Sequence, residues 1–258
     1  MNPKNLLMAF NANILANFEP ISLEEMGKVK LMNRVDSKFV AHIDKINELL
    51  EMAAPDYFIQ EIEGKRCMPY FTRYFDTSDT DMFYQHQRGK KVRQKVRLRV
   101  YETTANLPFL EIKSKNNKGR TKKKRVEMET GDELLNYSEF LENNCRYESN
   151  SLTPQIENHF YRITLVNKEL TERITIDTDI EFHNLQTGCS KKLPSIGIVE
   201  WKRDGISGKS GMGMLLRKLH IHQSGFSKYC IGMALTDPSL KQNRLKERLR
   251  KINKIEEH

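Results

Sequence analysis

The segment Lys95-Val96-Arg97-Leu98-Arg99-Val100-Tyr101 alternates basic and apolar side chains. Successive side chains of a β-strand point to opposite faces, so this segment predicts a strand with one charged and one apolar face. Similar alternation occurs at residues 34–38, 111–115, 173–177 and 200–202. Five such strands predict a sheet that curls around a wet, positively charged interior. An interior of this kind suits a highly anionic ligand, for which polyphosphate is the obvious candidate.

Composition narrows the class of protein. The chain has 258 residues and a formal net charge of +9, which allows one large domain or two small ones and favours anionic partners. No segment has the apolar length needed to span a bilayer. The first residues lack the features of a signal peptide, so a cytoplasmic protein is expected. The four scattered cysteines predict neither a disulfide framework nor a zinc site.

Periodicity and turn signals predict an antiparallel arrangement of strands with helices added. Strands are expected at residues 33–40, 69–76, 91–102, 108–115, 124–128, 155–166, 172–182 and 196–203. Helices are expected at residues 45–53, 132–143, 212–222, 226–235 and in the charged segment 239–258. Asp44 is the predicted N-cap of the helix at 45–53, and Ser22 with Glu25 has the spacing of a capping box. This pattern predicts an α+β fold built on an eight-stranded antiparallel β-barrel.

Several short motifs follow one another in a recognisable order. They are Arg34-Val35-Asp36-Ser37-Lys38-Phe39, Tyr74-Phe75-Asp76-Thr77 with Tyr84 and His86 after it, the segment 95–101, Phe109-Leu110-Glu111-Ile112-Lys113 with 122–125, Phe160-Tyr161-Arg162, the segment 173–179, Val199-Glu200-Trp201-Lys202 and Phe226-Ser227-Lys228-Tyr229. Over roughly residues 20–236 the chain thereby resembles the VTC domain, the polyphosphate polymerase branch of the triphosphate tunnel metalloenzymes (CYTH-like superfamily).

The resemblance implies an eight-stranded tunnel whose basic residues bind a triphosphate, with a glutamate near one mouth that holds a divalent metal. Members of the branch polymerise the γ-phosphate of ATP, typically with manganese. The wider superfamily carries Glu-x-Glu-x-Lys on its first strand, where this chain has Arg34-x-Asp36-x-Lys38. That departure argues against the hydrolase and cyclase branches. We expect residues 1–238 to form a VTC-type triphosphate tunnel domain and residues 239–258 a basic helical C-terminal tail.

Phosphoryl transfer depends chiefly on alignment and charge stabilisation, for which arginine and lysine are suited. The residues predicted to be catalytic are Arg97, Arg99, Lys113, Arg162, Arg173 and Lys228. Further phosphate-binding residues are predicted at Arg34, Lys38, Arg125 and Lys202. Glu200 is the predicted ligand of Mn²⁺ or Mg²⁺, with Glu111 as a second candidate or as a residue that orients cations. Asp177 and Asp179 are expected to be strand-end or turn residues. No histidine receives a catalytic role, because an acceptor phosphate is already ionised near neutral pH.

These predictions favour a metal-dependent, ATP-dependent polyphosphate polymerase whose partners are ATP and inorganic polyphosphate. The enzyme alternative is a triphosphatase that cleaves tripolyphosphate or a nucleoside triphosphate with the same cations. The alternatives without catalysis are a polyphosphate sensor and an RNA-binding module that uses the basic tail. RNA binding would weaken steeply with salt and would need the tail, whereas tunnel chemistry would tolerate its removal. No nucleic acid partner is expected, and any export of product would need a membrane or transport partner protein.

Overall fold

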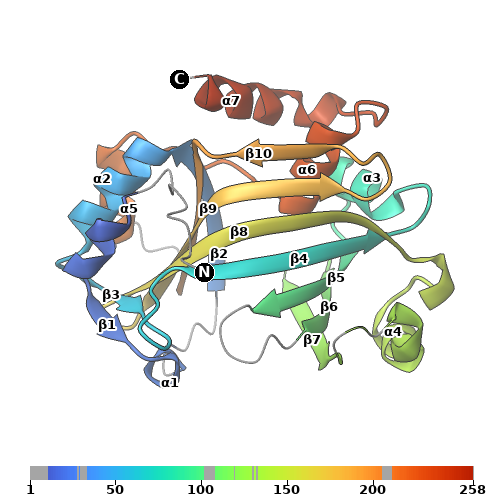
Figure 1. Cartoon of the computed structure of the whole chain (residues 1–258), viewed down its shortest axis with the longest axis horizontal. Helices are drawn as coiled ribbons and strands as arrows, with labels where there is room; N and C mark the ends of the chain where they lie inside the picture. Colours follow the sequence, from blue (N-terminus) through green and yellow to red (C-terminus); the bar gives the residue numbers. More distant parts are fainter. Residues whose placement is uncertain are drawn as a thin grey trace, which may run out of the picture.

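Eight strands form one continuous antiparallel path in the order β2-β11-β9-β8-β4-β5-β6-β7 (Figure 1). The computed structural model describes residues 11–27, 29, 34–101, 108–118, 120–129, 131, 133–204 and 211–257, with backbone only for Arg34 and Asp204. The strands are β2 (Arg34–His42), β4 (Met68–Asp76), β5 (Arg93–Tyr101), β6 (Pro108–Lys115), β7 (Thr121–Glu127), β8 (Thr153–Asn167), β9 (Glu172–Asn184) and β11 (Ile196–Asp204). The predicted α+β fold with eight antiparallel strands is confirmed. Short strands β1 (Glu19–Ile21), β3 (Tyr57–Gln60) and β10 (Ser190–Leu193) extend it and were missed by the sequence analysis.

The sheet curls so that its two ends approach each other. Lys38 of β2 and Thr121 of β7, the first and last strands of the path, line one cavity. Within the described residues no backbone pairing joins these two strands. The predicted barrel is therefore present as a barrel-like curl that backbone hydrogen bonds do not close in the described part.

Helices lie against the sheet and beside its edges (Figure 1). They are α1 (Leu23–Met26), α2 (Ile43–Ala53), α3 (Asp81–Gln87), α4 (Ser138–Asn144), α5 (Gly211–Lys218), α6 (Lys228–Thr236) and α7 (Lys246–Glu256), with 3-10 turns η1 (Ala12–Asn17), η2 (Leu134–Tyr137), η3 (Ser149–Ser151) and η4 (Asn243–Leu245). In the described part of the chain, none of the helices has the length and apolar character required to cross a membrane.

Three details differ from the sequence predictions. The N-cap of α2 is His42, whose Nδ1 accepts a hydrogen bond from the backbone N–H of Asp44 at 3.2 Å, so Asp44 itself is not the cap. The helix expected at 132–143 is divided into η2 and α4. Helix α3 was not predicted, and the buried carboxylate of Asp76 holds its first turn by accepting from the N–H groups of Met82 and Phe83. The capping box of Ser22 and Glu25 is present as predicted.

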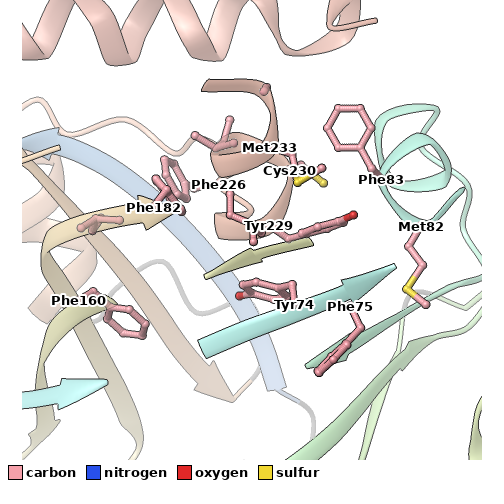
Figure 2. Packing of buried hydrophobic residues seen from close by; sticks show 14 of the residues in the cluster. Tyr74, Phe75, Met82, Phe83, Phe160, Phe182, Phe226, Tyr229, Cys230 and Met233 are labelled. Atoms are coloured by element: carbon pink, nitrogen blue, oxygen red, sulfur yellow. The ribbon is translucent and has the colours of Figure 1, made fainter. Parts of the chain in front are cut away.

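Helix α6 fills one end of the curled sheet with apolar side chains (Figure 2). The ring of Tyr229 lies 5.4 Å from the ring of Tyr74 on β4. Gly232 lets the helix approach closely, because a Cβ atom there would stand 2.5 Å from Phe182 and 2.8 Å from Ile156. This packing fixes the first residue of α6, Lys228, at the edge of the apolar cluster.

The C-terminal helix α7 packs on the same body. Leu245 and Ile252 are buried, and Glu256 accepts a hydrogen bond from the backbone N–H of Ser195 at 3.1 Å. Arg244, just before the helix, donates to the carbonyl of Arg88 at 2.6 Å. These contacts hold α7 beside the sheet, along β10 in Figure 1.

Candidate functional site

One face of the eight strands carries most of the predicted site residues. Residues directly opposite one another in an antiparallel pair share a face. The register places Lys38, Tyr70, Tyr74, Lys95, Arg97, Arg99, Glu111, Lys113, Lys123, Arg125, Arg162, Arg173, Asp177, Glu200 and Lys202 on the same face. We call it the inner face. Alternate residues such as Val96, Leu110 and Ile112 point the other way and are buried, as the alternation in the sequence predicts.

Glu111 holds the first pair of cations on the inner face. Arg97 donates to its Oε2 through Nε at 2.8 Å and Nη2 at 2.6 Å, and Lys123 donates to its Oε1 at 2.9 Å. Burial alone would raise the pKa of Glu111, but Arg97, Arg99 and Lys123 lower it to about 2. Both carboxylate oxygens hold cations, which is consistent with the predicted orienting role of Glu111.

Asp177 holds the second pair. Arg162 donates through Nε to Oδ1 at 2.6 Å and through Nη2 to Oδ2 at 2.8 Å, and Lys228 from α6 also donates to Oδ2. Burial would raise the pKa of Asp177, but these two cations lower it below its usual range. The expectation of a strand-end or turn residue was wrong for Asp177, because it lies inside β9 and faces two cations.

Glu200 holds the third pair. Lys38 donates to its Oε1, and Lys202 lies 3.1 Å from its Oε2. Burial would raise the pKa of Glu200, but Lys202 and Lys38 hold it well below its usual value, so it is ionised. Within the described residues no cluster of three His, Cys, Asp or Glu side chains could hold a metal by itself. A single ionised carboxylate that shares a metal with substrate phosphates is a common Mg²⁺ arrangement, and Glu200 fits it.

Further cations on the inner face, among them Arg99, Lys95 and Lys113, have no carboxylate within 4.0 Å among the described residues. Arg99 is 9% exposed, and its Nε has no hydrogen-bond partner there. Burial, together with Arg97 and Arg162, lowers the pKa of Arg99. Burial also lowers the pKa of Lys95 and of Lys113 to about 8. Because each carboxylate above serves two cations, the inner face as a whole has an excess of positive charge.

The predicted residues are placed unequally. Arg173 lies opposite Lys202 in the register of β9 and β11. Arg125 is on the inner face but exposed on the edge strand β7, with its guanidinium 4.9 Å from the ring centre of Phe109. The side chain of Arg34 lies outside the described residues. The remaining predicted cations come together on the inner face.

Some inner-face residues were missed by the sequence analysis. Tyr70 received no role in the site from the sequence, yet the guanidinium groups of Arg162 and Arg99 lie 4.9 and 5.7 Å from its ring centre. Lys95 and Lys123 were not assigned, although the alternation that selected Arg97 also selects Lys95. For Lys123 the signal was weak, because the run 122–125 is basic at every position.

Comparison with known proteins identifies the family. The model of the VTC domain matches residues 33–237. Similar solved structures include the PH1819 protein of Pyrococcus horikoshii OT3, with 15% identity over 78% of this chain and 98% of that chain and a TM-score of 0.46. A putative adenylate cyclase of Bacillus halodurans has 13% identity over 76% and 96% with a TM-score of 0.48. The mimivirus capping enzyme triphosphatase has 10% identity over 82% and 98% with a TM-score of 0.38.

No curated protein matches the chain in sequence. The segment that matches the family model spans most of the chain and contains all eight strands of the sheet path. The chain therefore belongs to the VTC domain family.

Proposed function

We propose that the protein is an ATP-dependent polyphosphate polymerase, which transfers the γ-phosphate of ATP to a growing inorganic polyphosphate chain and releases ADP. Membership of the VTC domain family and the cation-rich inner face support a tunnel enzyme that acts on triphosphate or polyphosphate. The observation that carries the proposal is Arg99, a buried guanidinium without an anionic partner among the described residues. A buried charge of this kind needs a counter-ion, and a phosphate supplies one.

The cations would have distinct tasks in the transfer. Arg97 and Arg162 are each held by a carboxylate through two hydrogen bonds, so their positions are fixed before substrate binds. Fixed positive charge around the transferring phosphoryl group stabilises the charge that spreads over its oxygens. A terminal oxygen of the acceptor chain attacks the γ-phosphorus, and the bond to the bridging oxygen of ADP breaks. The acceptor oxygen is already ionised near neutral pH, so no general base is assigned.

A divalent metal would be held by Glu200 together with substrate phosphates. Mn²⁺ or Mg²⁺ bound there would neutralise part of the phosphate charge. Glu200 itself would keep Lys38 and Lys202 in place through its two oxygens. Glu200 supplies only one carboxylate, so phosphate oxygens and water would have to complete the coordination of the metal.

Product analysis tests the proposal. The purified protein is incubated with ATP and Mn²⁺, and polyphosphate, ADP and free phosphate are followed together, with Arg97→Ala as the comparison. Polymer that accumulates with ADP in the wild type and is lost in Arg97→Ala supports the polymerase. Free phosphate without polymer would assign a triphosphatase instead. Tight triphosphate binding without any turnover would assign a sensor.

A further inference from the structure

A cavity of about 1030 Å³ opens at one end of the inner face. Pairs of facing residues on β5 and β6 lead to it, from Arg97 and Glu111 to Lys95 and Lys113 and then to Arg93 and Lys115. The last two pairs line the cavity. Each pair is two residues further along the strand, which is roughly 7 Å. The line of basic residues that runs along β5 from Arg99 to Arg93 is therefore about 20 Å long. This length exceeds that of a triphosphate.

Some cations of this cavity differ from the paired cations of the site, of which Lys38 also lines the cavity. Arg97, Arg162 and Lys38 are each paired with a carboxylate. We define the outer basic cluster as Arg93, Lys95, Lys115 and Arg248, all of which line the cavity. Within the described residues none of these four has a carboxylate within 4.0 Å. The charge of the outer basic cluster is thus uncompensated and open to an anion in the cavity.

The pKa of His86 on α3 is affected by the positive charge of the outer basic cluster. Its side chain lines the same cavity, and its Nδ1 is buried without a hydrogen-bond partner among the described residues. Burial and, to a smaller extent, the positive charges of Lys95, Arg93, Arg248 and Lys115 together lower the pKa of His86 to about 2. The imidazole is neutral chiefly because it is buried, and the four nearby cations act in the same direction. Four cations lying close together favour a polyanion in the cavity.

One member of the outer basic cluster comes from outside the family segment. Arg248 lies on α7, whereas the VTC domain match ends at residue 237. Its guanidinium lies against Gly225, where a Cβ atom would be 3.2 Å from Nη2. Gly225 precedes Ser227, whose Oγ accepts from Lys95 at 2.7 Å. Helix α7 therefore adds a cation to the mouth of the cavity and contacts the loop whose Ser227 binds Lys95 of β5.

We propose that the outer basic cluster is a subsite for the phosphate units of a polyphosphate chain that extend beyond the triphosphate on the inner face, and that Arg248 of α7 is a specificity-determining residue for long chains. This inference rests on the proposed function, since it assumes that the inner face binds phosphates. It gives the C-terminal helix a part in the site. Four uncompensated cations favour a linear polyanion over a single phosphate, because each successive unit carries its own charge.

Binding to tripolyphosphate and to a defined long polyphosphate tests the subsite. The full-length protein is titrated with each probe in buffer without metal, as the wild type, Arg248→Ala and Lys115→Ala. The control is Arg250→Ala, which removes the same charge from an exposed position on α7 that does not line the cavity. The subsite predicts that Arg248→Ala and Lys115→Ala each weaken long-chain binding by roughly threefold to fivefold. Tripolyphosphate binding and the Arg250→Ala control would stay as in the wild type.

The outcomes separate this inference from the proposed function. Equal long-chain affinity in Arg248→Ala, Lys115→Ala and Arg250→Ala would overturn the subsite while the inner-face function stands. Loss of ATP binding in Arg248→Ala with unchanged polyphosphate binding would overturn it in favour of a nucleoside contact. A wild-type protein that binds neither probe would contradict the proposed function itself.

Discussion

Asp177 on β9 and Arg162 on β8 face each other on the inner face and share two hydrogen bonds of 2.6 and 2.8 Å. The side chain of Asp177 is 5% exposed and that of Arg162 is 14% exposed. Lys228 approaches the same carboxylate from α6. The sequence analysis expected Asp177 to be a strand-end or turn residue. Its carboxylate instead holds two predicted phosphate ligands, Arg162 of β8 and Lys228 of α6.

Replacement of Asp177 by Asn should destabilise the free protein and make it depend more strongly on a polyanion. Removing one partner of a buried ion pair costs about 3–5 kcal/mol, because the other charge stays buried. Urea unfolding should show a loss of this size for Asp177→Asn. Added tripolyphosphate should raise the stability of the variant more than that of the wild type, since it replaces the lost negative charge. An unchanged urea midpoint would mean that the pair is not buried as described.

Triphosphate binding should weaken as pH rises through about 8. Burial lowers the pKa of Lys113, Lys202 and Lys228 to about 8 from a usual value of 10.5. Below this pH the lysines are charged and attract phosphate, and above it they lose their protons. Calorimetric titration between about pH 7 and pH 9.5 should show a falling affinity and proton uptake on binding at the higher pH. Affinity independent of pH in this range would argue against these lysines as phosphate ligands.

The stability of the protein without ligand should change with pH in the opposite direction. Between about pH 8 and pH 9 the unfolded chain binds more protons at these lysines than the folded protein does, so the free energy of unfolding rises with pH. Above this range Cys67 opposes the trend, because burial raises its pKa from 9.0 to about 12. Chemical denaturation at closely spaced pH values checks the sign. A decrease in stability from about pH 8 to pH 9 would contradict the lowered lysine pKa values.

Substitution of Glu200 by Gln should separate metal use from phosphate binding. Without the carboxylate, Mn²⁺-dependent turnover should fall by at least about tenfold. Binding of tripolyphosphate in metal-free buffer should not weaken, because Lys38 and Lys202 are released from Glu200 and become available to the anion. Turnover assays over a range of Mn²⁺ and a metal-free titration measure the two effects. Wild-type metal dependence in this variant would contradict the assignment of Glu200 as the metal ligand.

Gly232→Ala should disturb the attachment of α6. The added Cβ would stand 2.5 Å from Phe182 and 2.8 Å from Ile156, and overpacking of this kind costs about 1–3 kcal/mol. Because α6 carries Lys228, a shift of the helix would also move this lysine away from Asp177. The thermal unfolding temperature and the affinity for tripolyphosphate should therefore both decrease. A variant that keeps both would show that the contact of α6 with β8 and β9 relaxes easily.

The fold was largely predictable from alternation, because each strand has one charged and one buried face. Arg97, Arg99 and Lys113 could be assigned to the charged face of their strands for the same reason. Asp177 could not, since nothing in Asp177-Thr178-Asp179 distinguishes a strand interior from a turn. Helix α3 was missed because its start depends on Asp76, which accepts backbone hydrogen bonds from six and seven residues away. The place of Arg248 depends on how α7 packs, which no local pattern encodes.

The central claim is that the inner face is the phosphate site. Its most direct test is the binding of tripolyphosphate to matched variants. Arg99→Ala removes an inner-face guanidinium that has no carboxylate partner in the described part of the chain, whereas Arg73→Ala removes one on the opposite face that pairs with Glu157. The account predicts that Arg99→Ala weakens tripolyphosphate binding on the order of tenfold and that Arg73→Ala binds as the wild type does. Equal affinity in the two variants, with both folded, would contradict it.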